Sequence, residues 1–473
     1  MEKVFISHSR HPRLILLFLG WGMDATPFAG LYKNGYDILA VSDYTGYQNQ
    51  QHPFADLLPL LSTYREIVVA AWSFGVRIAA DFLNHASQLP VTRTLAINGT
   101  ETHIHDTRGI PHNIFNGTLD NLSPQTVRKF QRRMFGSAAA FATFQQNAPH
   151  RTFESMLGEL KTFAEIPPAS PARWDRAIIG NDDAIFPPDN QARAWQAIPA
   201  DKADGMTHFP DFQKILDLYV IDKDLVAERF SNAQITYRNN ASPQQASALK
   251  LWNLAGKHLP AAAPHISLLE IGVGEGLLTE LYLPLMRSAR ITLWDIAKIP
   301  PLTLPPQTIV ECCDAETAIR HLPDESIDLI LSSSTLQWFN SPAEFIRETA
   351  RVLRRGGIAA FSLFGPETYR EITEAAGTSL RYPTSRQLLD AAKATSGLET
   401  LECREEITQS IFQNVAEVLR NIKTTGVNAI SRDAASNSSA AIKLMRHYPV
   451  TAEGAAPLTY HSIHMVFKKP CPN

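Results

Sequence analysis

One serine stands in a setting that predicts a hydrolytic nucleophile. Ser73 lies in the run Ala71–Gly75, which reads AWSFG, between the apolar segment Ile67–Ala71 and the helical segment Val76–Leu83. Small residues two positions before and after the serine permit the sharp strand-to-helix turn that exposes a hydroxyl. A serine hydroxyl is a weak nucleophile, and it needs a general base, an orienting carboxylate and donors for an oxyanion. The chain should therefore supply these groups elsewhere.

The other members of such a triad follow in the order serine, aspartate, histidine. Asp182 and Asp183 both follow a short apolar segment, and Asp183 is favoured because it opens an Asp-x-aliphatic-aromatic-Pro frame. His208 lies on a later loop and is the candidate base. The backbone N–H groups of Trp21 and Phe74 are the candidate oxyanion donors. Together these residues predict attack of a hydroxyl on an acyl carbon.

A second constellation, of a different kind, begins at residue 270. Its glycines have the spacing GxGxG and not GxGxxG, so the dinucleotide-binding fingerprint is not met. Glycines let a ligand approach the backbone, and acidic residues at the ends of the next two strands suit the ribose hydroxyls and the adenine amino group. This pattern predicts S-adenosylmethionine as cofactor. The candidate binding residues are Glu270, Gly272, Gly274, Gly276, Asp295, Asp314 and Ala315.

Two successive α/β series must position these residues, because short apolar runs alternate with helical stretches in both halves. The predicted strands are Leu14–Leu19, Ile38–Val41, Ile67–Ala71, Thr94–Ile97 and Ala177–Ile179, then Ile266–Ile271, Ile291–Asp295, Thr308–Cys312, Ile327–Ser332 and Ile358–Leu363. Helices are expected at Ser123–Phe135, at Leu277–Leu285 and at Pro342–Leu353, the last stopped by Arg354–Gly357. We expect domains at 1–221 and 222–473, with a helical cap inserted at about 100–170.

Composition narrows the possible roles. The chain has 473 residues, of which 44% are hydrophobic and 19% charged, and its net charge is -3, so nothing points to nucleic acid or an anionic membrane. We expect no signal peptide, and the sequence contains no apolar run of about 18 residues. The 4 cysteines form no disulfide or metal pattern, which favours a reducing cytoplasm. The segment Thr102–Asp106 has metal-like residue types, but its spacing predicts a polar loop and no metal.

The first half resembles the α/β-hydrolase esterases of biotin synthesis that cleave pimeloyl-acyl carrier protein methyl ester, in their smaller BioG-type branch. The likeness covers about residues 1–220. It rests on Gly20–Met23, Ala71–Val76, Ile97–Thr100, Gly109–Pro111, Ile185–Pro188 and His208–Pro210. It implies an α/β-hydrolase fold with a helical cap, and Ser73, His208 and Asp183 as the triad.

The second half, about residues 223–470, looks like the malonyl-acyl carrier protein O-methyltransferases. The likeness rests on Arg229–Tyr237, Ala241, Pro243, Gln244, Ser332–Trp338, Leu419–Val427 and Pro457–His461, with Gly426-Val427 a small departure. It implies a class I, Rossmann-like methyltransferase fold. Tyr237, Gln337 and Trp338 are candidates for orienting a substrate carboxylate. The alternative is that Trp338 belongs to the core and Tyr237 packs a lid.

Acyl carrier proteins are acidic, so basic helices should receive them. One candidate surface is Arg128, Lys129, Arg132 and Arg133 in the cap, and another is Arg347, Arg351, Arg354 and Arg355. The expected protein is a bifunctional biotin-precursor enzyme. Two alternatives stay open: a carboxylesterase fused to a small-acid O-methyltransferase that needs no carrier protein, and a protein in which one half only binds its ligand.

Overall fold

The computed structural model describes residues 1–259, 266–286, 288–376, 381–426 and 444–471. The chain divides into two compact units, Met1–Leu216 and Asp217–Asn473. The boundary expected from the sequence stands slightly later, after residue 221. Val427, which ends one of the motifs quoted above, lies outside the described residues. Among the described residues, no helix is long and apolar enough to cross a bilayer.

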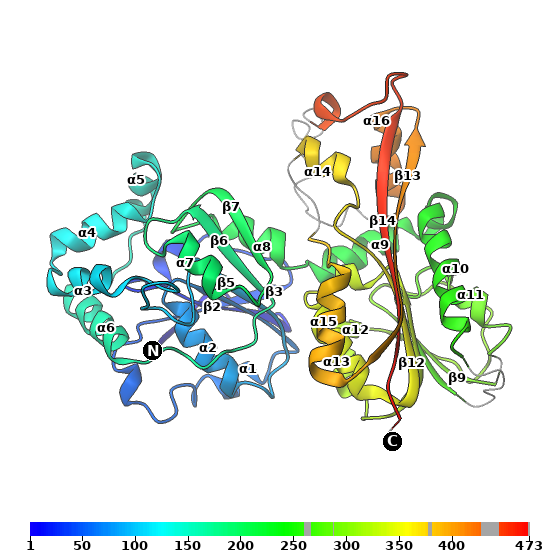
Figure 1. Ribbon diagram of the computed structural model, residues 1–473, viewed down its shortest axis with the longest axis horizontal. Coiled ribbons are helices and arrows are strands. Elements are labelled where there is room, and N and C mark those ends of the chain that lie inside the picture. Colours follow the sequence, from blue (N-terminus) through cyan, green and yellow to red (C-terminus); the bar gives the residue numbers. More distant parts are fainter. Residues whose placement is uncertain (260–265, 287, 377–380, 427–443, 472–473) are drawn as a thin grey trace. The chain divides into compact units, whose positions relative to one another are not determined.

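The first unit is built on a mixed sheet of seven strands (Figure 1). They are β1 (Glu2–Ser7), β2 (Arg13–Phe18), β3 (Tyr36–Ser42), β4 (Glu66–Trp72), β5 (Val91–Ile97), β6 (Arg176–Asp182) and β7 (Ala200–Thr207). Their order is β1-β3-β2-β4-β5-β6-β7, with β1 antiparallel to β3 and all other neighbours parallel. Strands β3 and β4 are buried along their whole length, which explains why the centre of the sheet reads as apolar runs.

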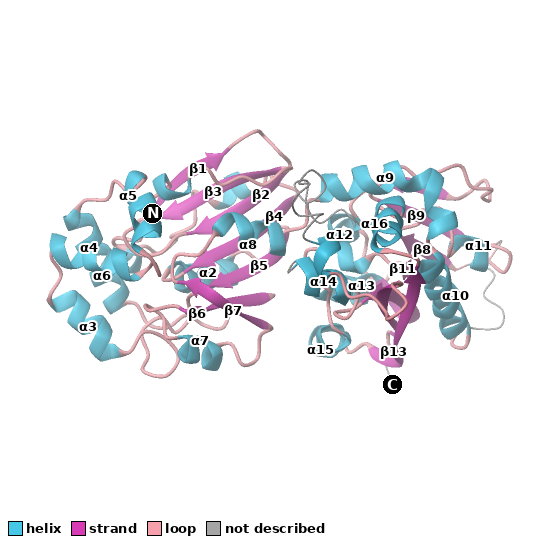
Figure 2. Ribbon diagram, turned by 90° about the horizontal axis from the view of Figure 1, so that it is seen from above, coloured by secondary structure: helices cyan, strands magenta, loops and turns pink. Residues whose placement is uncertain are grey.

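The helices of the first unit include a group inserted between β5 and β6. They are α1 (Leu58–Leu61), α2 (Gly75–His85), α3 (His112–Asp120), α4 (Pro124–Arg133), α5 (Ala138–Gln146), α6 (Phe153–Glu165), α7 (Pro188–Ala194) and α8 (Phe212–Tyr219), with short turns η1 (Thr26–Phe28) and η2 (Tyr47–Asn49). Figure 2 shows α3, α4, α5 and α6 gathered beyond one end of the sheet. The side chains of Ser123, Ser137 and Thr152 each accept a backbone N–H, which explains where α4, α5 and α6 begin.

The second unit has its own sheet of seven strands. They are β8 (Ser267–Ile271), β9 (Arg290–Asp295), β10 (Ile309–Cys312), β11 (Ile327–Ser333), β12 (Leu353–Phe364), β13 (Glu399–Phe412) and β14 (Ala456–Lys468). Their order is β10-β9-β8-β11-β12-β14-β13, and β14 runs antiparallel to both of its neighbours. The antiparallel pair β13 and β14 has no counterpart among the strands expected from the sequence.

The helices of the second unit cover both faces of this sheet. They are α9 (Lys223–Asn240), α10 (Ser242–Gly256), α11 (Thr279–Tyr282), α12 (Ala315–Ala318), α13 (Pro342–Val352), α14 (Arg370–Ala376), α15 (Ser385–Ser396) and α16 (Val415–Thr424), with turns η3 (Ile319–His321) and η4 (Leu336–Trp338). Helix α11 is shorter than expected. Helix α13 ends at Val352, next to the expected end at Leu353, but Arg354–Gly357 lie within β12, which starts earlier than the expected Ile358. Gly356 adopts a φ of 79° there, within a stretch where the register of β12 shifts.

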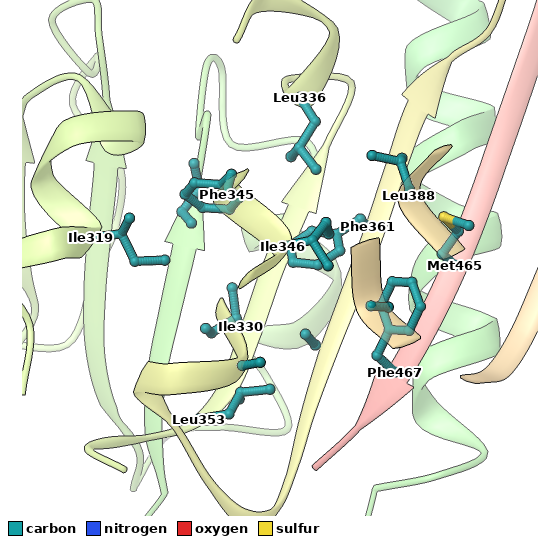
Figure 3. Packing of buried hydrophobic residues seen from close by; sticks show 14 of the residues in the cluster. Ile319, Ile330, Leu336, Phe345, Ile346, Leu353, Phe361, Leu388, Met465 and Phe467 are labelled. Atoms are coloured by element: carbon teal, nitrogen blue, oxygen red, sulfur yellow. The ribbon is translucent and has the colours of Figure 1, made fainter. Parts of the chain in front are cut away.

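The core of the second unit lies on both faces of its sheet, because successive strand residues point to opposite sides. In β11, Leu329 and Leu331 join the cluster that contains residues of α10, whereas Ile330 joins the one that contains residues of α13 and α15. Figure 3 shows the second of these clusters, in which Phe345 and Phe361 pack together with ring centroids 6.3 Å apart. Each buried aliphatic side chain contributes about 1.5–3 kcal/mol to stability. The sheet is thus a rigid base for loops at its edge.

Candidate active sites

Ser73 occupies a tight turn between β4 and α2, with a φ of 58° that non-glycine residues rarely adopt. The turn is closely packed: a Cβ added to Gly75 would lie 2.5 Å from the carbonyl oxygens of Phe18 and Leu19. A Cβ added to Gly99 would lie 2.2 Å from the carbonyl oxygen of Ser73. The neighbouring glycines are therefore a steric requirement of the turn that presents the serine.

His208 joins the serine to an aspartate. Its Nε2 lies 3.0 Å from Ser73 Oγ, and its Nδ1 lies 3.0 Å from both carboxylate oxygens of Asp183. Ser73, His208 and Asp183 are 3%, 1% and 5% exposed, so water barely competes for these contacts. Asp182 is exposed at the end of β6. The geometry is that of a nucleophile, a base and a group that orients the base.

The carboxylate of Asp183 is fixed by its own loop. Its Oδ1 accepts the backbone N–H groups of Ile185 at 2.8 Å and Phe186 at 2.9 Å, and its Oδ2 accepts Nε2 of Gln191 at 3.1 Å. The ring of Phe186 also lies parallel to the His208 ring, with centroids 6.0 Å apart. The residues after Asp183 thus hold both the carboxylate and the imidazole in place.

Asn98 locks the histidine loop, a role that the sequence did not reveal. It follows β5 with a φ of 44° and is fully buried. Its Oδ1 accepts the N–H of Gly180 at 2.7 Å, and its Nδ2 donates to the carbonyl of His208 at 3.0 Å. Trp72 Nε1 donates to the same carbonyl at 2.7 Å. The position of Asn98, a polar residue directly after an apolar strand, was the one feature of the sequence that could have suggested this role.

The two expected oxyanion donors border a small apolar cavity. Trp21 and Phe74 both line it, and their backbone N–H groups have no acceptor within the described part of the chain. The cavity and its open mouth together measure about 340 Å³. Its other lining residues are Ile110, Ile114, Phe115, Thr118, Phe130, Arg133, Leu160 and Ile185. An acyl chain of moderate length would find apolar walls beside the triad.

A buried carboxylate holds the Trp21 loop against the cap. Glu159 of α6 accepts the N–H of Gly22 at 2.9 Å and the N–H of Tyr44 at 3.0 Å. Arg151 lies 3.3 Å from the same carboxylate, and Trp21 Nε1 donates to a carbonyl of α6 at 2.8 Å. Burial raises the pKa of Glu159 to about 6, with Arg151 opposing the rise. The cap therefore fixes the backbone next to the Trp21 donor.

The four basic residues expected to receive a carrier protein have different environments. Arg128 and Lys129 are exposed on α4, and no ion pair involves them among the described residues. Arg132 donates to the carbonyl of Phe135, and Arg133 to that of Ala184, at 2.9 and 2.8 Å. The arginines of the other candidate set all form ion pairs. Arg347 pairs with Glu344, Arg351 with Asp324 and Glu348, Arg354 with Asp328, and Arg355 with Glu325.

The polar loop Thr102–Asp106 is not a metal site in the described structure. His103 is buried, its Nε2 lies 2.9 Å from the carbonyl of Phe163, and burial lowers its pKa to about 4. No group of three or more metal-ligating side chains occurs among the residues that the structure describes.

The second unit contains a cavity with about 810 Å³ of empty space at the ends of β8, β9, β10 and β11. Seven of the residues expected to bind cofactor or substrate line it: Gly272, Gly274, Asp295, Asp314, Ala315, Tyr237 and Trp338. They come from α9 and from four different strand ends, so the parallel sheet brings together residues far apart in the chain.

The glycine loop leaves room for a ligand. Gly272 has a φ of 71°, and a Cβ there would lie 1.8 Å from Thr335 Oγ1. Gly274 has a φ of 52° and open space where its Cβ would be. Its N–H donates to Asp295 Oδ2 at 2.8 Å, and Ala297 donates to Asp295 Oδ1 at 2.8 Å. The ribose site would therefore be a carboxylate oriented by its own loop.

Asp314 presents an unused acceptor. Its Oδ1 caps α12 by accepting the N–H of Glu316 at 3.1 Å and contacts Lys223 Nζ at 3.3 Å. Its Oδ2 is buried and has no partner in the described structure. Lys223, another cavity residue, is held 2.8 Å from Glu316. The free Oδ2 suits an amino group such as that of adenine, so these residues fit S-adenosylmethionine.

Three expected residues do not reach this cavity. Glu270 points toward α11, where it accepts the hydroxyls of Thr279 at 2.7 Å and Tyr282 at 2.6 Å, and burial raises its pKa to about 7. A Cβ on Gly276 would contact Leu302. Gln337 is buried and donates to the carbonyl of Ser334 at 2.8 Å. Their influence on a ligand would be indirect.

Known proteins resemble both halves. A family model described as pimeloyl-ACP methyl esterase BioG matches residues 1–214, and a methyltransferase-domain model matches residues 269–361. A malonyl-[acyl-carrier protein] O-methyltransferase of Bacteroides fragilis is 35% identical over 474 residues, covering 96% of this chain and 92% of that protein. An uncharacterized protein of Haemophilus influenzae is 38% identical over 188 residues, covering 38% of this chain and 81% of its own.

Among solved structures, BioG from Haemophilus influenzae is 31% identical, with a TM-score of 0.39, and the match covers 44% of this chain and 94% of that one. The second unit has a methyltransferase fold that uses S-adenosylmethionine. The chain therefore belongs to the malonyl-[acyl-carrier protein] O-methyltransferase family, as a bifunctional biotin-related member that joins a BioG-type ester hydrolase domain to its methyltransferase domain.

Proposed function

We propose that the second unit esterifies the free carboxylate of malonyl-acyl carrier protein, and that the first unit hydrolyses pimeloyl-acyl carrier protein methyl ester to pimeloyl-acyl carrier protein and methanol. The observation that carries this proposal is the Ser73–His208–Asp183 chain beside an apolar cavity, in a polypeptide whose other unit holds a cofactor cavity. Masking the carboxylate would let the chain be extended in an apolar pocket, because burying a charge is costly.

In the first unit, which we assign to the α/β-hydrolase fold with α3 to α6 as its cap, Ser73 Oγ attacks the ester carbonyl. His208 Nε2 accepts the serine proton and then delivers it to the departing methanol. Asp183 holds the imidazole in the productive tautomer, and the N–H groups of Trp21 and Phe74 receive the oxyanion. Water activated by His208 then releases the acyl group from Ser73.

In the second unit, S-adenosylmethionine supplies a methyl group on a positively charged sulfur. Asp295 and Asp314 would hold its ribose and adenine, while Gly272, Gly274 and Ala315 would let it approach the backbone. A malonyl carboxylate is ionised at neutral pH, so no general base is required. Tyr237 and Trp338 wall the cavity, and they would orient the carboxylate and exclude water. Gln337 would support the loop before Trp338.

We assign the carrier-protein contact to Arg128 and Lys129 on α4. These two side chains are exposed, whereas the four arginines around α13 are already paired with carboxylates. Arg132 and Arg133, which donate to backbone carbonyls and keep their charge, would add to the positive surface of α4. An acidic carrier would be steered to unpaired cations in preference to neutralised ones. We place the enzyme in the cytoplasm, a reducing compartment that suits its free cysteines.

The test offers both carrier-bound substrates to the wild type, Ser73→Ala and Gly272→Arg. We expect Ser73→Ala to lose only ester cleavage, because it removes the nucleophile and leaves the second unit intact. We expect Gly272→Arg to lose only methylation, because a side chain at 272 collides with Thr335. Loss of both activities from either change would contradict separate sites. Equal rates on free malonate and simple methyl esters would favour the alternative that needs no carrier.

A further inference from the structure

Four tyrosines gather beside the part of the cofactor cavity that Trp338 lines. We define the tyrosine cluster as Tyr237, Tyr369, Tyr382 and Tyr460, which come from α9, the turn before α14, the segment before α15, and β14. The rings of Tyr369 and Tyr460 meet edge to face, with centroids 5.4 Å apart. Tyr382 packs against the hydrophobic cluster of those two rings and also against the smaller one that contains Trp338. The cluster is therefore continuous with the cavity wall.

Aromatic contacts connect Trp338 with Tyr237 as well. The ring of Phe230 lies 5.5 Å from that of Trp338 and 6.4 Å from that of Tyr237, and all three residues line the cavity. Trp338 is 6% exposed, and its Nε1 is a buried donor without an acceptor in the described structure. A buried donor left unsatisfied is costly, so this group is suited to a ligand that brings an acceptor.

The hydroxyls of the tyrosine cluster stay protonated at neutral pH. Burial raises the pKa of Tyr369 well above its usual value, and the neighbouring hydroxyls of Tyr460, Tyr382 and Tyr237 raise it further. Burial likewise raises the pKa of Tyr237 and of Tyr382, and it raises the pKa of Tyr460 to about 12. The cluster as a whole is therefore neutral. The Tyr369 hydroxyl is hydrogen-bonded to Tyr460, and the Tyr460 hydroxyl donates to Asn421 Oδ1 at 3.4 Å, so the hydroxyls of Tyr237 and Tyr382 are the candidate donors to a ligand.

A neutral set of donors suits methyl transfer to a carboxylate. The reactants carry opposite charges and the products carry none, so charge is lost on the way to the transition state. A cation beside the carboxylate would stabilise the ground state more than the transition state and would slow the reaction. Lys223, the buried cation of the cavity, is instead engaged by Asp314 and Glu316.

We propose that the hydroxyls of Tyr237 and Tyr382, held in the tyrosine cluster, and the Trp338 Nε1–H form a carboxylate subsite, in which neutral donors receive the ionised end of a short acyl chain. This inference rests on the proposed methylation. A carboxylate oxygen forms a bond to the methyl carbon while the methyl–sulfur bond breaks, and the electron pair of that bond stays on sulfur, which becomes a neutral thioether. No proton is transferred, so the hydroxyls act only as hydrogen-bond donors.

The experiment compares Tyr237→Phe, Tyr382→Phe and Trp338→Phe in the full chain. For malonyl-acyl carrier protein we expect kcat/KM to fall about tenfold or more in each, since a hydrogen bond to a charged group is lost. The Kd of S-adenosylhomocysteine, measured by calorimetry, should change less than about twofold. Tyr448→Phe is the matched control, because Tyr448 packs in the same hydrophobic cluster but its hydroxyl already donates to the Pro457 carbonyl at 2.6 Å.

The outcomes separate the two ideas. Unchanged kcat/KM in all three variants, with normal methylation by the wild type, would overturn the subsite and leave the proposed function standing. Absence of methylation of any carboxylate by a wild type that binds S-adenosylhomocysteine would overturn both. If a variant loses S-adenosylhomocysteine binding in step with activity, its side chain serves the cofactor and the subsite is wrong at that residue.

Discussion

At the scale of single residues, strand alternation decides which acidic groups reach a ligand. Leu268 belongs to the hydrophobic cluster on the α10 face of the sheet, and Leu269 belongs to the one on the opposite face. Glu270 shares the direction of Leu268, so its carboxylate meets Tyr282 of α11 and not the cavity. Asp295 and Asp314 escape this rule because each stands at or after the last residue of its strand. The period of two could have excluded Glu270 from the sequence alone.

The substitution Glu270→Gln tests whether the Glu270 carboxyl is buried against α11, because such a group makes the stability of the protein depend on pH. The pKa of Glu270 is raised from 4.5 to about 7, so between these values the folded chain holds a proton that the unfolded chain has lost. The stabilisation from this proton is complete below pH 4.5 and disappears as the pH rises through 7. Because each pKa unit is worth about 1.4 kcal/mol, the wild type should lose up to about 3 kcal/mol relative to Glu270→Gln between pH 4.5 and 8.

Urea unfolding of the second unit, followed at both pH values, measures this difference, and the cofactor affinity of the variant should stay within about twofold of the wild type. Glu280→Gln is a suitable comparison, because Glu280 is exposed on α11, the helix that the Glu270 carboxylate contacts. A large loss of cofactor binding in Glu270→Gln, with an unchanged pH dependence, would show that the carboxylate contacts the ligand directly.

The triad candidates show both the reach and the limit of sequence reasoning. Order along the chain and position after strands pointed to Ser73, His208 and the Asp182–Asp183 pair, and the structure brings Ser73, Asp183 and His208 into contact. Asn98 could not be found in this way, because its partners lie about 80 and 110 positions away and meet only when β5, β6 and β7 are side by side.

At the scale of elements, the sequence predicts buried parallel strands well and exposed or antiparallel ones poorly. Each expected strand overlaps a real one. Strands β2 and β4 are buried and apolar on both faces, whereas β10 was also expected although it is exposed. The strand β7 reads ADKADGMT and offers no apolar run, and β13 is largely exposed. Such strands form because a neighbouring edge supplies hydrogen bonds, which composition does not show. The polar start of β12, at Arg354–Gly357, was missed for the same reason.

Helix α6 has a role beyond covering the sheet, because Glu159 ties it to the loop of Trp21. Each oxygen of Glu159 accepts one backbone N–H, and a glutamine can replace only one of them. We expect Glu159→Gln to lower the kcat of ester hydrolysis about tenfold or more, with little change in KM, because the oxyanion donor is displaced. Hydrolysis of a carrier-bound methyl ester under saturating conditions measures kcat.

The methyltransferase activity of the same preparation serves as an internal control for Glu159→Gln, and it should stay unchanged. Glu165→Gln is the matched variant, since Glu165 is exposed at the end of the same helix. A change confined to KM, or an equal effect in both variants, would contradict a positioning role for Glu159.

At the scale of the whole molecule, the residues that we assign to each reaction lie within one unit. Every residue placed in the triad and its apolar cavity belongs to 1–216, and every residue placed around the cofactor cavity belongs to 217–473. Each unit has its own sheet of seven strands. Domains with separate cores usually fold separately. The fused chain thus joins a methyltransferase and an ester hydrolase whose proposed sites share no residue.

Separate pieces 1–221 and 222–473 should therefore each keep their own activity, with kcat/KM within about threefold of the full chain. The position of the cut matters, because α8 spans the boundary between the units: Phe212 at its start packs on Phe28 and Trp72, so a cut after residue 216 would sever a helix that the first core uses. We expect the piece 1–216 to unfold at a lower temperature than 1–221 in calorimetry.

The second piece keeps Asp222, whose side chain accepts the N–H of Leu225 at 2.8 Å and starts α9. If either piece is folded but inactive, and mixing the two restores activity, then one site depends on the other unit and the division of labour argued above is wrong.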